Sequence, residues 1–110
     1  GNRVFIVTGG SRLSIDLILN VHQMAGFFDG IIAAENYKKS KPDPEPFLTC
    51  IEKFNISGTM HGIEDSIQGI ESLKNAGILA VGVHNPLIVQ KSDLYFPEIN
   101  EYLKYLMAQG

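Results

Sequence analysis

Several features are scarce or missing in this 110-residue sequence, and each absence excludes a class of protein. The only cysteine is Cys50, so no internal disulfide can form, which fits a reducing, cytoplasmic compartment. No apolar run reaches the 18 residues that suggest a membrane-spanning helix, and no signal peptide is visible. The net charge of −3 provides no basic footprint for nucleic acid or an anionic membrane surface. With 45% hydrophobic and 19% charged residues, the chain has the composition of one folded domain over residues 1–110.

Short apolar runs alternate with amphipathic stretches along the chain. The pattern predicts strands at residues 3–8, 30–34, 59–63 and 78–83, and a short one at 93–96. It predicts helices at residues 12–25, 44–55, 66–76 and from Pro97 to about residue 108. Strands that alternate with helices indicate an α/β fold, with a Rossmann-like parallel sheet and flanking helices.

The first predicted helix has clear end signals. Ser11 is a suitable N-cap, and Gly26 is expected to end the helix. An apolar stripe along this helix predicts which side packs against the sheet. The stripe is formed by Leu13, Leu17, Val21 and Met24, with Ile18 alongside.

Polar and charged residues follow three predicted strands. Thr8 ends the first strand, Lys41 lies in the run KSKPDP at residues 39–44, and Glu64 and Asp65 follow the strand at 59–63. Two adjacent acids at the tip of a buried strand are costly to desolvate unless a cation is present, and Mg²⁺ prefers such oxygen ligands. Because ligands of parallel sheets bind beyond the carboxyl ends of the strands, we expect these side chains to converge on one rim.

Three motifs in this order resemble the haloacid dehalogenase superfamily, in its β-phosphoglucomutase and phosphoglycolate phosphatase branch. VTGGSR at residues 7–12 resembles the second family motif, and FDGII at 28–32 with KSKPDP at 39–44 resembles the third. GIEDSIQGI at 62–70 resembles the fourth. The resemblance implies a Mg²⁺-dependent phosphatase or phosphomutase acting on a small phosphorylated metabolite.

The resemblance also implies a role for each matching residue. Thr8 would donate its hydroxyl to a phosphoryl oxygen, and the backbone N–H of Gly9 would assist it. Lys41 would neutralise the phosphoryl group and the nucleophile. Asp65 would bind Mg²⁺ directly, and Glu64 would bind it directly or through water. Phosphoryl transfer depends mainly on this kind of positioning and charge stabilisation.

One family motif has no counterpart in these residues. Family members begin with a strand that ends in Asp-x-Asp, which supplies the nucleophile and the acid/base, and this sequence contains no Asp-x-Asp. The cap domain that selects the substrate in this branch also has no counterpart. The chain therefore resembles the carboxyl-terminal part of such an enzyme, a partial core with motifs two to four, and we expect it to be inactive alone.

The missing strand is central in the family, between the strands that end at Thr8 and Asp65. Its absence leaves two exposed strand edges, which is a liability. Three outcomes are open: a separate amino-terminal segment fills the gap, the two strands pair directly, or two copies form a homodimer by strand exchange. The competing class of function is a non-enzymatic domain that self-associates, and a third is a fragment completed in trans.

Each candidate residue also has an ordinary structural interpretation. Glu64 and Asp65 could be a solvated helix start, where acids favour the helix dipole. Arg12 is expected on a helix surface, Ser66 as a helix cap and Cys50 in the core. The three histidines show no metal-ligand spacing. A nucleotide-binding turn at residues 7–12 is disfavoured because the further glycines of that motif are missing.

Overall fold

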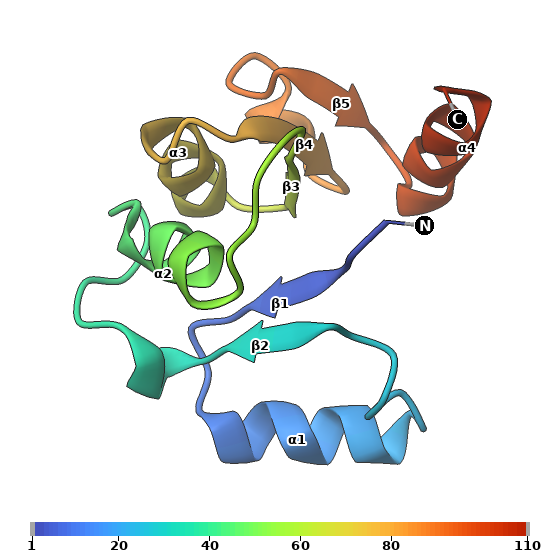
Figure 1. Cartoon of the computed structure of the whole chain (residues 1–110). Helices are drawn as coiled ribbons and strands as arrows, with labels where there is room; N and C mark the ends of the chain where they lie inside the picture. Colours follow the sequence, from blue (N-terminus) through green and yellow to red (C-terminus); the bar gives the residue numbers. More distant parts are fainter. Residues whose placement is uncertain (1, 110) are drawn as a thin grey trace.

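The computed structural model describes residues 2–109 and has an α/β architecture with parallel strands. Five strands alternate with helices and two short 3₁₀ turns, η1 and η2 (Figure 1). The strands are β1 (Phe5–Val7), β2 (Gly30–Ile32), β3 (His61–Glu64), β4 (Leu79–Val83) and β5 (Leu94–Phe96). The helices and turns are α1 (Arg12–Val21), η1 (Ala34–Asn36), α2 (Glu45–Lys53), α3 (Ile67–Asn75), η2 (Pro86–Ile88) and α4 (Ile99–Gln109). The predicted fold class and the sequence of elements are confirmed.

The strands form two separate sheets. β1 pairs with β2, and the second sheet has the order β3-β4-β5. Direct pairing of β1 with β3, one of the expected outcomes, is therefore wrong within the described residues. Each of these strands lies at an edge of its own sheet, so each has unpaired backbone groups on one side.

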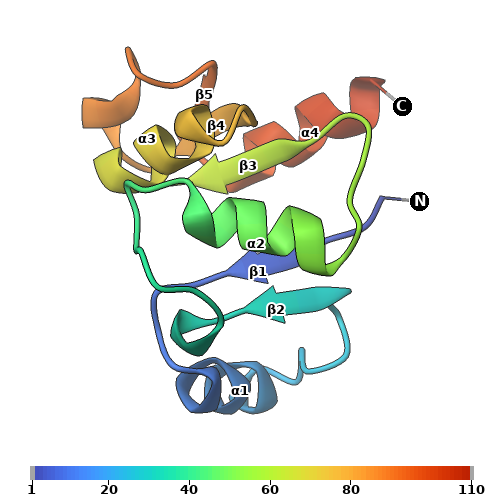
Figure 2. The same cartoon turned by 60° about the vertical axis from the view of Figure 1, so that its left-hand side comes forward.

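Helix α2 joins the two sheets. It packs against β1 and β2 on one side and against α3 on the other, and Figure 2 shows it crossing in front of β1. Cys50 is buried on its inner face, as the sequence predicts, and Phe47 is buried beside it. α2 therefore carries the packing between two sheets that share no strand pair.

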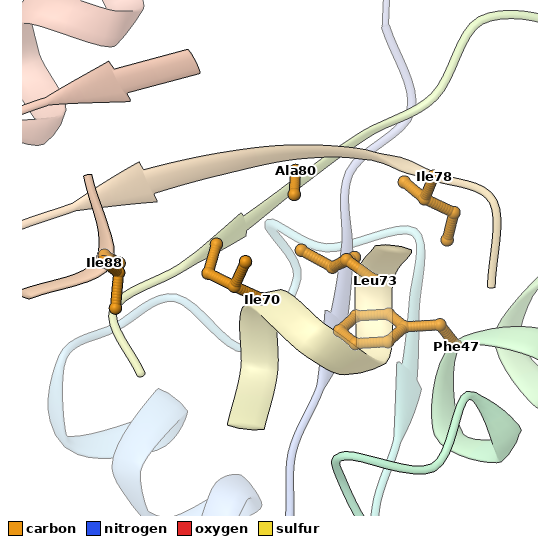
Figure 3. Close-up of a cluster of buried hydrophobic side chains, with 6 residues drawn as sticks. All are labelled: Phe47, Ile70, Leu73, Ile78, Ala80 and Ile88. Carbon is orange, nitrogen blue, oxygen red and sulfur yellow. The ribbon is translucent and has the colours of Figure 1, made fainter. Parts of the chain in front are cut away.

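The main core lies between α3 and the sheet β3-β4-β5. Ile70 and Leu73 point from α3 toward Ala80 of β4 (Figure 3). Phe47, Ile78 and Ile88 complete this cluster. On the opposite side of the sheet, Tyr102 of α4 packs with Val81 and Val83 in a second cluster. Burial on both faces is what a parallel sheet requires.

The predicted inner face of α1 is wrong. The helix ends at Val21, and Gln23 takes the left-handed conformation (φ 57°) that was expected of a glycine. Leu19 is buried, whereas the predicted stripe faces outward. Leu13, Leu17 and Val21 are 70%, 58% and 76% exposed. The stripe does have helical spacing, but none of the described residues packs over it.

Two aspartates fix the outer strands by the same arrangement. The N–H of Asp29 donates to the carbonyl of Val4 (2.7 Å), and its carboxylate accepts from the N–H of Val4 (2.6 Å). The N–H of Asp93 donates to the carbonyl of Ala80 (2.9 Å), and its carboxylate accepts from the N–H of Ala80 (2.8 Å). Each aspartate immediately precedes an outer strand, so its two hydrogen bonds fix the pairing register of that strand in its own sheet.

Candidate active site

The Thr8 loop begins where β1 ends. The N–H of Thr8 continues the ladder by donating to the carbonyl of Ile32 (2.9 Å). The Thr8 hydroxyl accepts from the N–H of Gly10 (3.1 Å), which closes a tight turn. The N–H of Ala34 in turn donates to the carbonyl of Gly10 (2.9 Å). The backbone therefore fixes Thr8 at the carboxyl end of β1, as predicted.

The loop that carries Lys41 is anchored on α3. Ser72, which is fully buried, donates its hydroxyl to the carbonyl of Asp43 (2.7 Å). Asn75 donates its side-chain amide to the carbonyl of Pro42 (3.2 Å). The Lys41–Pro42 peptide bond is cis. These contacts aim the Lys41 side chain at the space between the two sheets.

Lys41 contacts the carboxyl ends of both inner strands. Its ammonium group lies 3.3 Å from the carbonyl oxygen of Val7 in β1 and 2.5 Å from the Glu64 carboxylate in β3. The Lys41 and Glu64 side chains are only 20% and 12% exposed. The ring of Phe47 lies 5.0 Å below the ammonium nitrogen. With so little solvent, the attraction between the two charges is stronger than in a surface pair, but burying them also costs solvation, so each charge depends on its partner.

The two predicted metal acids have different surroundings. Glu64 packs over Gly69 in the first turn of α3, where a side-chain Cβ would overlap its carboxylate. Asp65 is exposed, and its backbone carbonyl accepts from the side-chain amide of Asn85 (3.0 Å). Within residues 2–109, no three His, Cys, Asp or Glu side chains come together as a metal site would require.

The structure brings all three predicted segments to one rim. Thr8 and Gly9 follow β1, Lys41 reaches across from its loop, and Glu64 and Asp65 end β3. Their chemical roles stay predictions. Ser66 caps α3 by accepting from the N–H of Gly69, as the sequence indicates.

The remaining polar candidates have structural partners. Arg12 pairs with Asp16 on α1 (3.0 Å), which agrees with its predicted surface position. His61 hydrogen bonds to the hydroxyl of Tyr102 (2.9 Å), so it serves the packing of α4.

Sequence reasoning missed Tyr37. Its hydroxyl donates to the carbonyl of Thr8 (2.9 Å), and burial raises the pKa of this phenol. Tyr37 follows η1 in a polar loop where no periodicity marks it as a contact residue. Ser72, Asn75 and Asn85 also escaped notice, because a helix or loop position does not reveal which backbone carbonyl a polar side chain meets.

Comparison with known proteins places these observations in a family. The family model of haloacid dehalogenase-like hydrolases matches residues 1–83. Fructose-1-phosphate phosphatase of Escherichia coli is 34% identical over 85 residues, which cover 76% of this chain and 45% of that protein. β-Phosphoglucomutase of Bacillus subtilis is 40% identical over 57 residues, covering 51% of this chain and 25% of that protein.

Solved structures agree with the sequence relatives. The crystal structure of β-phosphoglucomutase from Clostridium difficile superimposes with a TM-score of 0.83 and 28% identity, over 94% of this chain and 48% of that one. The chain thus spans about half the length of this structural neighbour and of the fructose-1-phosphate phosphatase. Among the described residues, no helix is long and apolar enough to cross a membrane. The chain belongs to the haloacid dehalogenase-like hydrolase family.

Proposed function

We propose that this chain is the carboxyl-terminal part of a cytoplasmic, Mg²⁺-dependent phosphatase or phosphomutase that acts on a small phosphorylated metabolite. The observation that carries the proposal is the position of Lys41, whose ammonium group contacts the ends of β1 and β3 at once. The names of the relatives, a sugar-phosphate phosphatase and a phosphoglucomutase, support the same substrate class.

Each rim residue has a role that suits phosphoryl transfer. The Thr8 hydroxyl and the Gly9 N–H would donate to phosphoryl oxygens. Lys41 would offset the negative charge of the phosphoryl group, and a charge-assisted hydrogen bond of this kind contributes about 1.5–3 kcal/mol. These groups bind, orient and stabilise charge, which is most of what the reaction asks of a protein.

The acids at the end of β3 fit a magnesium ion. Mg²⁺ is usually held by one or two carboxylates together with waters and substrate phosphate, so two acids are enough, although no third ligand side chain joins them within residues 2–109. Asp65 would be a direct ligand, because its carboxylate is exposed. Glu64 would bind directly or through water, and it also holds Lys41 in place. When bound, the ion would supply positive charge to the transferring group.

The 110 residues do not contain a nucleophile of the family type, because they include no Asp-x-Asp. We therefore propose that they are inactive by themselves, since loss of a nucleophile costs on the order of a million-fold in rate. The unpaired edges of β1 and β3 would receive the strand that brings the missing aspartates. The whole enzyme would then arise from one longer chain or from a fragment completed in trans.

A second candidate is a non-enzymatic domain that self-associates by strand exchange. The unpaired edges of β1 and β3 and the exposed apolar stripe of α1 favour it. Size-exclusion chromatography distinguishes the two candidates at the outset. A stable dimer that does not dissociate when an Asp-x-Asp segment is added would favour this second candidate.

The main experiment is complementation. The 110-residue chain is co-expressed with an amino-terminal segment that ends a strand with Asp-x-Asp, and hydrolysis of p-nitrophenyl phosphate is followed with and without Mg²⁺. We expect no turnover by the chain alone, and Mg²⁺-dependent turnover by the pair that Asp65→Asn abolishes. Asp16→Asn is the matched control, because Asp16 contacts Arg12 on α1. Turnover by the chain alone would overturn the inactivity proposal, and none by the folded pair would overturn the complementation proposal.

A further inference from the structure

The Thr8–Gly9 peptide group is held from one side by a single side chain. The hydroxyl of Tyr37 donates to the carbonyl oxygen of Thr8 at 2.9 Å. The ring is partly buried, and burial raises the pKa of its hydroxyl, so this group stays protonated and able to donate at neutral pH. The side chain that makes this contact comes from the segment after η1, about 30 residues away in sequence.

A contact to this carbonyl also fixes the direction of the next N–H. The six atoms of a peptide group lie in one plane, and in a trans peptide the C=O and the N–H point in opposite directions. The only cis bond in the described residues is Lys41–Pro42, so the Thr8–Gly9 bond is trans. Anchoring the carbonyl of Thr8 on Tyr37 therefore turns the N–H of Gly9 away from Tyr37.

The N–H of Gly9 has no acceptor within residues 2–109, whereas its neighbours do. The Thr8 N–H donates to Ile32, and the Gly10 N–H donates to the Thr8 hydroxyl. Gly9 is exposed at the rim, in the loop that directly follows the strand whose last carbonyl Lys41 contacts. An oriented N–H without a protein partner is suited to an anionic oxygen.

We propose that Tyr37 is a positioning residue that aims the Gly9 N–H at a phosphoryl oxygen. This inference rests on the proposed function, because it needs a phosphoryl group at this rim. Tyr37 does not touch the reacting atoms, and it acts through the Thr8–Gly9 peptide group. If the hydroxyl is removed, the Tyr37 ring keeps its packing, but the Thr8 carbonyl loses the hydrogen bond that holds the Thr8–Gly9 peptide group from the Tyr37 side.

The test uses the 110-residue chain with Tyr37→Phe, which removes one oxygen atom and keeps the ring. Tyr95→Phe is the matched control, because Tyr95 is a half-buried tyrosine on β5 whose hydroxyl makes no hydrogen bond to another of the described residues. Both variants are first compared with the parent chain by thermal unfolding. Binding of inorganic phosphate in the presence of Mg²⁺ is then measured by NMR titration, and residual dipolar couplings report the direction of the Gly9 N–H without any ligand.

We expect Tyr37→Phe to change the Gly9 dipolar coupling and to weaken phosphate binding about tenfold, the loss of one charge-assisted hydrogen bond. Tyr95→Phe should leave both unchanged. An unchanged Gly9 coupling and an unchanged Kd in Tyr37→Phe would overturn the inference.

The two proposals fail in different ways. If the parent chain binds no phosphate, the proposed function fails at this rim, and with it the phosphoryl target of Gly9. In that case the Gly9 dipolar coupling still tests whether Tyr37 orients the Thr8–Gly9 peptide group. An unchanged coupling in Tyr37→Phe would overturn this orienting role as well. If the parent chain binds phosphate but Tyr37→Phe leaves the Gly9 coupling and the Kd unchanged, the proposed function stands and the positioning role of Tyr37 is wrong.

Discussion

Lys41 and Glu64 form an ion pair between two sheets that share no strand pair, with 2.5 Å between the ammonium nitrogen and the carboxylate. Because Lys41 also contacts the carbonyl oxygen of Val7, the pair links the carboxyl ends of β1 and β3. Lys41 comes from a loop and Glu64 from the end of β3, and both side chains are mostly buried. Removing either one therefore leaves the other charge with little solvent around it.

Replacing Lys41 with methionine tests how much this ion pair contributes to the stability of the fold. Lys41→Met should lower the free energy of unfolding by about 1–3 kcal/mol, because the Glu64 carboxylate is left only 12% exposed and without its cation. The double variant Lys41→Met/Glu64→Gln should recover most of the loss. Urea unfolding gives both values. Lys39→Met is the control, because Lys39 is exposed, and an equal effect from it would contradict the prediction.

Gly69→Ala should destabilise the chain although alanine is the better helix former. An added Cβ would overlap the Glu64 carboxylate, which Lys41 holds in place, and we expect a cost of about 1–3 kcal/mol. The same substitution in a Glu64→Ala background should be neutral or stabilising. Gly26→Ala is the control, because open space surrounds Gly26. Additive effects of the Gly69 and Glu64 changes in thermal unfolding would refute the contact.

Ser72→Ala should loosen the loop that presents Lys41. The Ser72 hydroxyl is fully buried and donates to the carbonyl of Asp43, so its removal leaves that carbonyl unpaired, at a cost of about 1–3 kcal/mol. Faster amide exchange across residues 40–44 should accompany the loss. Ser40→Ala, at an exposed position, serves as the control. Unchanged exchange in Ser72→Ala would show that the loop is held by other contacts.

The buried thiol predicts a specific alkaline sensitivity. Burial raises the pKa of Cys50 from 9.0 to about 11, so the folded state holds its proton more tightly than the unfolded state. Stability is therefore fully present below pH 9 and falls as the pH rises from 9 to 11, by about 2–3 kcal/mol from this group. Urea unfolding at pH 8, 9, 10 and 11 measures the decline. Cys50→Ala should remove the part of this decline that comes from the thiol. If stability falls equally steeply with pH in the parent chain and the variant, Cys50 is not the cause.

Local signals in the sequence predicted most of the elements. Ser11 and Ser66 cap helices because their hydroxyls reach N–H groups only three residues ahead, and Gly77 ends α3 with a φ of 77°. The Thr8, Lys41 and Glu64 convergence was also predictable, since parallel strands put their carboxyl ends on one edge.

What the sequence could not reveal depends on partners distant along the chain. The stripe through Leu13 and Leu17 has helical periodicity, but periodicity does not say whether anything packs against it. The partners of Tyr37 and Asn85 are backbone carbonyls, which every residue has, so no pattern identifies them. The end of α1 was misplaced because Gln23 adopts a positive φ that is usual for glycine.

The division of the strands into two sheets, each locked in register by its own aspartate, has a consequence for native-state hydrogen exchange. Cooperative opening units follow contiguous packing, and here the packing is continuous within each sheet and crosses between them mainly through α2. The β1–β2 unit, whose helix α1 has Leu19 as its buried residue, should open at a lower free energy than the unit built on β3, β4 and β5. Amides of the first unit would then exchange as one group while those of the second remain protected.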